Sequence, residues 1–155
     1  AEQLPGLVGG FGPEWVGVSV TMPGKFAALQ FADERTERAE LVGSANTLVH
    51  TDHGWRADNT DVDGVAGALG HHRHLRHAIV LGSGGTAPAA LVGLAELGVT
   101  EITVVARNRD NAARLLGLAA AVGGSETTLP TTTASGRTSP WTRTPRNRER
   151  RTVPT

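Results

Sequence analysis

The 155-residue sequence contains no cysteine, which excludes disulfide bonds and thiolate metal sites and gives no sign of an oxidising compartment. It has no run of about 18 apolar residues, the length that a membrane-spanning helix needs, and no charged-then-apolar leader segment. Basic and acidic side chains balance at 15 each, so the net charge identifies no partner. We therefore predict a soluble cytoplasmic protein with no membrane partner.

The neutral total conceals an uneven distribution of charge. Residues 1–124 carry 9 basic and 13 acidic side chains, whereas residues 125–155 carry 6 arginines and 2 glutamates. The last segment also holds 10 threonines and 4 prolines, and its few apolar side chains cannot offset the entropy lost on ordering. We predict a disordered Thr/Arg/Pro-rich tail there, either a basic arm for nucleic acid or the product of an altered reading frame. Nucleic acid is the less favoured partner because the arginines are not interleaved with aromatic residues.

The segment from residue 78 to residue 97 has the pattern of a strand, a tight turn and a helix. A short apolar run at 78–81 ends in the glycine-rich turn 82–86, and leucines then recur at helical spacing. Glycines let the backbone approach a pyrophosphate closely, while amides and the positive end of the helix face the anion. The run departs from G-x-G-x-x-G because Ala87 stands at the third glycine position. We predict a dinucleotide-binding turn; the alternative is an ordinary turn of an α/β protein.

A second strand at 101–105 follows Gly98, the predicted left-handed cap of that helix, and completes a β-α-β unit within about thirty residues. An NAD site would place Asp or Glu near the end of this strand to hold the ribose 2′-hydroxyl, but no carboxylate occurs there before Asp110. Arg107 and Arg109 occur instead, and a guanidinium suits a 2′-phosphate because it makes paired, charge-assisted hydrogen bonds. The sequence therefore favours NADP, unless both arginines are simply solvated.

The first part of the chain begins with a predicted loop at 1–14 and a buried strand at 16–21. A helix is predicted from Pro23, with Thr21 near its cap position. Lys25 falls in the first turn of this helix, where the helix dipole disfavours a positive charge. This lysine is therefore either an exposed side chain or one retained for chemistry.

Beyond a charged run at 33–40, a strand is predicted at 43–50, followed by a hairpin turn at 52–54 and a returning strand at 55–58. A helix then opens with Asn59 or Thr60 as its cap and with acidic residues in its first turn, where the dipole favours them. Ordinary capping accounts for this acidic start equally well, so no chemical role is assigned to it from position alone.

Four of the six histidines lie within residues 71–77. Arginines interrupt them and no acidic or cysteine ligand is nearby, so a zinc site is disfavoured and no metal is predicted. We interpret this segment as a solvated linker between two domains. After the β-α-β unit, residues 111–122 keep helical spacing until two glycines follow.

Three ordered blocks, V-S-V-T-M-P-G-K at 18–25, G-S-A-N-T-L at 43–48 and D-N-T-D-V-D-G at 58–64, resemble the shikimate dehydrogenase family. The motifs V-L-G-S-G-G-T-A and V-V-A-R-N extend the likeness, which covers roughly residues 10–122 and none of the tail. The resemblance implies an α/β fold in two domains. Together with the composition, it divides the chain into an N-terminally truncated substrate-binding and catalytic α/β domain at 1–70, a linker at 71–77, a partial Rossmann-like NADP-binding domain at 78–124 and the disordered tail at 125–155.

The resemblance also implies an NADP-dependent oxidoreductase that interconverts 3-dehydroshikimate and shikimate, in chorismate and aromatic amino acid biosynthesis. It implies that Lys25 and Asp61 form the catalytic pair. Oxidising a secondary alcohol needs a base at the hydroxyl and the reverse needs an acid, and a lysine paired with a carboxylate can serve as both. The implied substrate contacts are Thr21, Asn46, Asn59 and Thr60. The implied cofactor contacts are Gly82, Ser83, Gly84, Gly85, Thr86, Arg107, Asn108 and Arg109.

The chain departs from the family pattern in what it omits. The opening strand with a Ser-x-Ser pair, the second half of the cofactor domain and the closing glutamine-bearing helix are absent from the sequence. The leading hypothesis is a partial shikimate dehydrogenase acting on a small-molecule substrate, with a homodimer left open. The alternatives are a non-catalytic truncated or frame-altered product, a nucleic-acid-binding protein, and an NAD-preferring quinate/shikimate enzyme, against which Arg107 argues.

Overall fold

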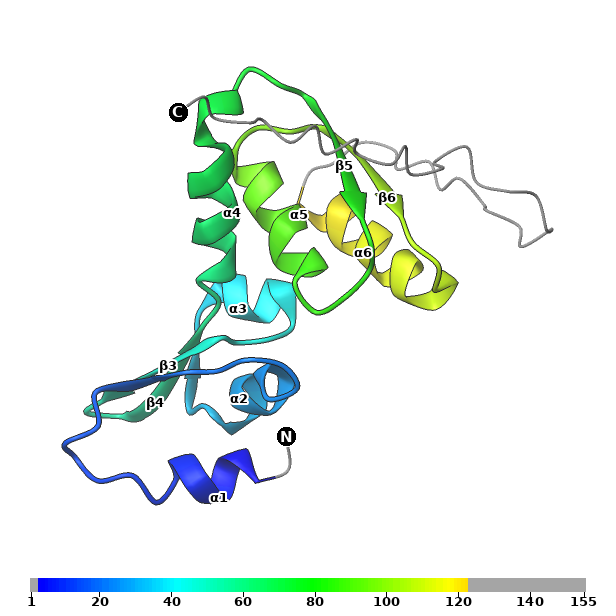
Figure 1. Cartoon of the computed structure of the whole chain (residues 1–155). Helices are drawn as coiled ribbons and strands as arrows, with labels where there is room; N and C mark the ends of the chain where they lie inside the picture. Colours follow the sequence, from blue (N-terminus) through cyan, green and yellow to red (C-terminus); the bar gives the residue numbers. More distant parts are fainter. Residues whose placement is uncertain (1–2, 123–155) are drawn as a thin grey trace, which may run out of the picture.

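The computed structural model describes residues 3–122, in which two sheets lie in two parts of the molecule joined by helices (Figure 1). The predicted disordered tail at 125–155 lies outside the described residues. The elements in chain order are α1 (Leu4–Val8), β1 (Gly17–Ser19), α2 (Lys25–Phe31), β2 (Glu34–Arg35), α3 (Glu37–Val42), β3 (Thr47–Thr51), β4 (Gly54–Asp58), α4 (Asp61–Leu69), the 3₁₀ turn η1 (Gly70–His72), β5 (His77–Leu81), α5 (Ala87–Glu96), β6 (Glu101–Val105) and α6 (Arg109–Ala121).

The first sheet has four strands in the order β1-β3-β4-β2. Strand β3 pairs antiparallel with β1 and β4, and the two-residue β2 runs parallel to β4. The predicted hairpin is confirmed, with Gly54 at φ +106° at the start of its returning strand and Thr47 opposite Asp58 at its open end. The core of this part includes the fully buried Leu48 and Ala28. The hairpin therefore brings the strand ends that carry the polar motifs to one edge of the sheet.

The second sheet consists of the parallel pair β5 and β6, joined through α5 as the β-α-β pattern predicts. Helices α5 and α6 cover one face, with Leu91, Val104 and Leu115 buried between helix and sheet. On the other face Ile79 and Leu81 are 68% and 80% exposed. One face of this small sheet is therefore apolar and open among the described residues.

Helices α4 and α5 pack along each other and link the two parts (Figure 1). A Cβ added at Gly93 of α5 would lie only 2.9 Å from the carbonyl oxygen of Val62 in α4. Glycine is therefore required for this close helix approach. A small cluster of buried apolar residues packs around this contact; α3 contributes Val42 to it, and α5 contributes Ala89 and Val92.

Several local predictions need correction. Residues 1–14 contain helix α1 instead of loop only, because Pro5 sits in its first turn and Val8 is buried against the core. Helix α2 begins at Lys25 and not at Pro23, because the Gly24 N–H donates to the Thr21 carbonyl oxygen and forms a turn that precedes the helix. Thr21 is therefore not the cap of this helix.

The charged run 33–40 also holds two short elements that were not predicted. Thr36 caps α3 by accepting a hydrogen bond from the Ala39 N–H, and the helix ends at Gly43 in the left-handed conformation. Residues 43–46, predicted as the start of a strand, are therefore the turn that leads into β3. Elements this short leave too few positions for a hydrophobic period to show.

Among residues 3–122, no helix combines the length and the apolar character that crossing a membrane requires.

Candidate active site

The fold brings together a lysine and an aspartate that lie 36 residues apart in the chain. Lys25 is the first residue of α2 and Asp61 the first residue of α4. The Lys25 Nζ donates to Asp61 Oδ2 over 2.5 Å, and the lysine residue is only 8% exposed. Lys25 is also the only lysine in the sequence. The two sequence-predicted catalytic residues therefore form a largely buried ion pair.

Asn46 holds the second oxygen of this carboxylate. Its Nδ2 donates to Asp61 Oδ1 over 2.8 Å. Its own Oδ1 accepts the Thr60 backbone N–H over 2.8 Å and the Thr47 hydroxyl over 2.9 Å. The amide orientation is thereby fixed, and Asp61 has one oxygen facing the lysine and one facing Asn46. Sequence-predicted Asn46 and Thr60 thus lie beside the pair.

Thr21 and Asn59 are placed differently. Thr21 is exposed in the turn before α2, and its hydroxyl donates to the Met22 carbonyl oxygen over 3.0 Å. Asn59 is 1% exposed, and its Nδ2 donates to the Ser44 carbonyl oxygen over 2.8 Å. Its side chain therefore holds the turn before β3 from inside, which differs from the expected position beside substrate hydroxyls. The close spacing of polar residues after β4 could not reveal which of them turns inward.

Arg38 and Asp58 form a second polar cluster next to the pair, which the sequence analysis did not single out. Hydrogen bonds from the Arg38 guanidinium, with help from Thr36 and the Asn59 N–H, lower the pKa of Asp58 to about 2, and partial burial opposes this shift. The pKa of Arg38 is raised by its hydrogen bond to Asp58, with a further contribution from Asp63. No motif signals this cluster, because its members come from different elements.

The glycine-rich turn after β5 opens into a cavity of about 650 Å³. Gly82 takes φ +107°, a conformation that side-chain-bearing residues rarely adopt, and a Cβ at Gly84 would meet nothing within 4 Å. Thr86, which is exposed, directly precedes α5, so the N-terminal amides of a ten-residue helix follow the turn. The cavity is lined by Gly82, Ser83, Gly84, Arg107, Asn108 and Asn111.

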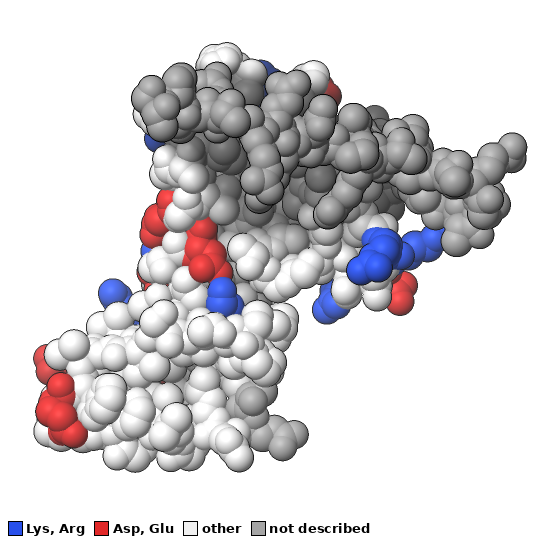
Figure 2. All heavy atoms as spheres, in the orientation of Figure 1, with Lys and Arg blue, Asp and Glu red and all other residues white. Residues whose placement is uncertain are grey.

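The arginine end of this cavity is organised by the start of α6. Asn108 caps the helix, its Oδ1 accepting the Asn111 N–H over 2.9 Å. Arg107 is exposed and lines the cavity, whereas Arg109 is exposed and lies outside its lining. Basic side chains are visible over this region in Figure 2. Of the two arginines predicted from the sequence, the structure brings one to the glycine turn.

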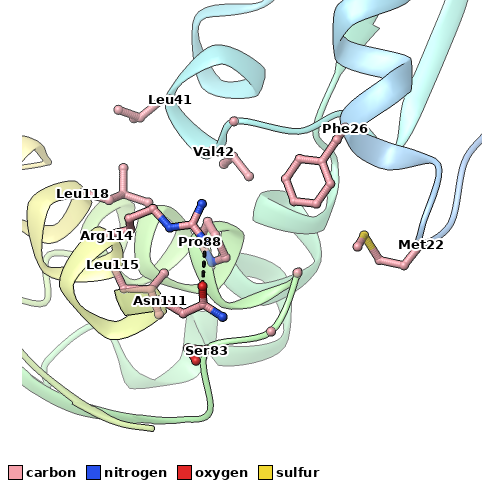
Figure 3. Close-up of a pocket in the computed structure, with 13 residues that line it drawn as sticks. Met22, Phe26, Leu41, Val42, Ser83, Pro88, Asn111, Arg114, Leu115 and Leu118 are labelled. Atoms are coloured by element: carbon pink, nitrogen blue, oxygen red, sulfur yellow. Dashed lines mark hydrogen bonds between the residues drawn. The ribbon is translucent and has the colours of Figure 1, made fainter. Parts of the chain in front are cut away.

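A second cavity of about 480 Å³ lies between the two parts of the molecule (Figure 3). Met22 and Phe26, which flank Lys25 in the chain, face the glycine turn and the side chain of Arg114 across it. Arg114 donates to Asn111 Oδ1 over 2.5 Å. Gly85 lies so close to Met22 that an added Cβ would be 3.0 Å from its sulfur. The turn and the lysine-bearing helix therefore share one cavity, although Lys25 itself is not part of its lining.

The histidine segment shows no metal-binding geometry. Among residues 3–122, no group of three or more His, Asp or Glu side chains is arranged to hold a metal ion. His72 and His74 make a tilted ring contact with centroids 6.2 Å apart.

Comparison with known proteins links this arrangement to one family. Residues 1–48 match the family model described as the shikimate dehydrogenase substrate binding domain. The shikimate dehydrogenase (NADP(+)) of Synechocystis sp. is 40% identical over 117 residues, which is 73% of this chain and 40% of that protein. The corresponding protein of Roseobacter denitrificans is 44% identical over 101 residues, 61% of this chain and 36% of its own.

Solved structures extend the likeness to the fold. The crystal structure of Mycobacterium tuberculosis shikimate dehydrogenase has a TM-score of 0.79 at 75% identity, over 84% of this chain and 49% of that one. A Thermus thermophilus shikimate 5-dehydrogenase, solved in complex with NADP(H) and shikimate, has a TM-score of 0.68 at 30% identity, over 77% of this chain and 46% of that one. The α/β fold predicted from the sequence is confirmed. The chain spans less than half the length of each of these proteins.

Proposed function

Since the chain belongs to the shikimate dehydrogenase family, we propose that it carries the catalytic pair for the NADP-dependent interconversion of 3-dehydroshikimate and shikimate. This step belongs to chorismate and aromatic amino acid biosynthesis. The single observation that supports it most is the Lys25–Asp61 ion pair, partly buried at the starts of two helices and hydrogen-bonded to Asn46. We also propose the cytoplasm as its compartment and keep the division near residues 70 and 77 as the domain boundaries.

The proposed proton chemistry belongs to Lys25. Its ammonium donates a proton to the carbonyl oxygen of the substrate during reduction, and its neutral amine removes the hydroxyl proton during oxidation. Asp61 does not touch the reacting oxygen in this scheme. Its carboxylate holds the Nζ in place through their hydrogen bond.

The proposed substrate contacts lie around this pair. Asn46 is hydrogen-bonded to both Thr60 and Asp61, so these polar groups are held rigidly where the hydroxyls of a ring substrate would meet them. The exposed Thr21 lies four residues before Lys25 and can reach the same substrate from the turn. Asn59 supports the site from inside through Ser44.

The residues at the glycine turn fit a dinucleotide phosphate. The open space above Gly84, the positive φ of Gly82 and the following helix suit a pyrophosphate, and Arg107 suits a 2′-phosphate. Gly82, Ser83, Gly84, Gly85 and Arg107 would hold NADP, with Thr86, Asn108 and Arg109 at its margin. When bound, NADPH supplies the hydride that the substrate carbonyl carbon accepts. The Thermus thermophilus relative, whose structure contains NADP(H) and shikimate, supports these two molecules as the ligands.

The test compares Lys25→Ala and Lys25→Arg in the 155-residue chain. In the parent chain, shikimate should drive the reduction of NADP, which the absorbance of NADPH measures. In both variants kcat should fall about 10²- to 10⁴-fold, while calorimetry still detects the binding of shikimate. Lys25→Arg is the sharper variant because arginine keeps the positive charge but does not release its proton near neutral pH. Lys25→Arg retaining most of the activity would remove the proton-transfer role.

A second candidate is a non-catalytic product that binds the ligands without turnover. The chain spans 36–49% of the length of the four relatives named above. In that case the parent chain shows no NADPH formation at any substrate concentration. Calorimetry then separates two cases. Retained binding of shikimate or NADP leaves the site assignment standing without turnover, whereas binding of neither rejects it.

A further inference from the structure

Arg38 of α3 contacts two carboxylates, Asp58 and Asp63, that lie on either side of Asp61 in the chain. Its Nε and Nη2 donate to the two oxygens of Asp58 over 2.7 and 2.6 Å, and its Nη1 donates to Asp63 Oδ1 over 2.7 Å. Asp58 is the last residue of β4 and Asp63 lies in the first turn of α4. Asp61 lies between these two residues in the chain. One guanidinium therefore ties together the strand end and the helix start that flank Asp61.

The Asp58 side of this arrangement also fixes the short segment leading to Asp61. Asp58 Oδ1 accepts the Asn59 N–H over 2.8 Å and the Thr36 hydroxyl over 2.8 Å. The next N–H, that of Thr60, is held by Asn46. The backbone from 58 to 61 is thus fastened to α3 on one side and to Asn46 on the other. The position of the Asp61 carboxylate therefore depends on how firmly the segment 58–61 is held.

The two arms of Arg38 differ in burial. The Asp58 side chain is 19% exposed and accepts a paired, two-point hydrogen bond, whereas the Asp63 side chain is 59% exposed and accepts one. Partly buried, paired contacts of this kind are stronger than exposed single ones. Lysine could not replace Arg38 fully, because it lacks the planar fork that engages both carboxylate oxygens. Figure 2 shows red and blue side chains close together over the neighbourhood of α3 and α4.

We propose that Arg38 is a positioning residue for Asp61: it clamps the β4–α4 turn through Asp58 and Asp63 and so keeps the carboxylate against Lys25. The contact with Asp58 carries most of the effect and the contact with Asp63 a smaller part. The catalytic meaning of this clamp rests on the proposed function, but its effect on the Lys25–Asp61 pair does not.

The sole lysine gives a direct test. Burial and the hydrogen bond to Asp61 shield the Lys25 Nζ from an acylating reagent, so the acylation rate of Lys25, measured by peptide mass mapping, reports on the pair. Asp61→Asn breaks the ion pair and gives the reference acylation rate of Lys25 in its absence. Arg38→Gln should raise the rate at least about threefold over the parent chain, with Arg38→Lys and Asp63→Asn between the two. Arg35→Gln is the matched control, since the side chain of this exposed arginine of β2 donates to the Gln30 carbonyl oxygen and to no other group within residues 3–122.

A double variant separates positioning from general loosening of the fold. In the Asp61→Asn background, Arg38→Gln should add less than about twofold to the Lys25 rate, because the pair is already broken. Loosening would add to the rate in both backgrounds, and circular dichroism at the assay temperature identifies variants that have unfolded. An unchanged Lys25 rate in folded Arg38→Gln, or an equal increase in both backgrounds, overturns the proposal.

The activity assay adds a second readout. Arg38→Gln should lower kcat about tenfold and change the KM for shikimate less than about twofold, because Arg38 holds the catalytic carboxylate and not the substrate. A chain that forms no NADPH but shows the expected Lys25 rates supports the clamp while the proposed function fails. A chain whose kcat and Lys25 rate are both indifferent to Arg38→Gln keeps the proposed function and loses the clamp.

Discussion

The part of the molecule built on β1–β4 and the part built on β5 and β6 differ in how completely each covers its own sheet. The first has a four-stranded sheet with a buried core, and the polar side chains at the edge of this sheet hold one another through hydrogen bonds such as that from Asn46 to Asp61. The second has two parallel strands, and Ile79 and Leu81 leave one face apolar and exposed among the described residues. Parallel sheets are usually covered on both faces. The lysine–aspartate pair is therefore placed by tertiary contacts within the described residues, whereas the glycine turn is placed by local β-α geometry.

The arginines show the same contrast. Arg38 in the first part is committed to two carboxylates, so its charge is already used. Arg107 in the second part is exposed and lines the cavity at the glycine turn, so its charge is available to an anionic ligand. The first part uses a guanidinium to build the site, and the second offers one for binding.

Asp61→Asn should produce the largest change, because it removes the charge that holds Lys25 in the first part of the molecule. We expect kcat for shikimate oxidation to fall about 10²- to 10³-fold, measured by NADPH absorbance, with NADP binding unchanged. Asp52→Asn, in the exposed turn of the hairpin, is the matched control and should keep full activity. A loss of NADP affinity with an unchanged kcat would contradict the proposal that the first part carries out proton transfer and the second binds the cofactor.

Arg107→Ala should affect the second part alone. We expect the affinity for NADP to fall about 10- to 100-fold and that for NAD less than about twofold, because the guanidinium meets a phosphate that NAD lacks. Calorimetry with each dinucleotide measures the difference, and Arg73→Ala provides an exposed arginine for comparison. Equal losses for NADP and NAD would contradict the assigned contact.

Gly93→Val should weaken the joint between the two parts. The added side chain would meet the Val62 carbonyl oxygen and the Val65 side chain, so we expect the free energy of unfolding to fall by about 1–3 kcal/mol. Gly67→Ala in the neighbouring α4 is the control, since an added Cβ there meets nothing within 4 Å and should stabilise the helix by up to about 1 kcal/mol. Denaturant titrations measure both, and a Gly93 variant as stable as the parent would show that α4 and α5 can separate without cost.

Lowering the pH should reduce the free energy of unfolding by less than Gly93→Val does, through a contact in the first part of the molecule. The Arg38 hydrogen bond lowers the pKa of Asp58 from the ordinary 3.8 to about 2, so its stabilising contribution is present above about pH 4 and disappears as the pH falls through about 2. We expect about 1 kcal/mol of unfolding free energy to be lost over this interval because solvent screens part of the interaction. Asp58→Asn should lack this component and Asp52→Asn should retain it. Identical acid profiles for parent and Asp58→Asn would rule it out.

Much of the fold could be predicted because its signals are local. The hairpin around Gly54, the helix from Asp61 and the β5-α5-β6 unit all have turn residues and hydrophobic periods that act within a few residues. The short helices α1 and α3 and the start of α2 escaped prediction, because their boundaries depend on contacts with distant segments and on a turn before Lys25.

The candidate site divides in the same way. Lys25, Asp61 and Asn46 were identified through a family resemblance, and the structure shows that they touch. Asn59 turns inward, and Arg38 of α3 clamps Asp58 of β4 and Asp63 of α4. Neither could be deduced from spacing, since the direction of a side chain depends on what packs around it.

By itself the sequence determined the residue chemistry: one lysine, the polar blocks at strand ends, a glycine turn and an arginine in place of an acidic residue after the second strand. These features follow from composition and from local backbone preferences, which neighbouring residues impose. Only the tertiary structure decided that the lysine meets the aspartate, that Arg38 ties down the turn before it, and that Gly93 lets two helices approach. These are contacts between residues distant in the chain, and they exist only once the whole fold has fixed the relative positions of its elements.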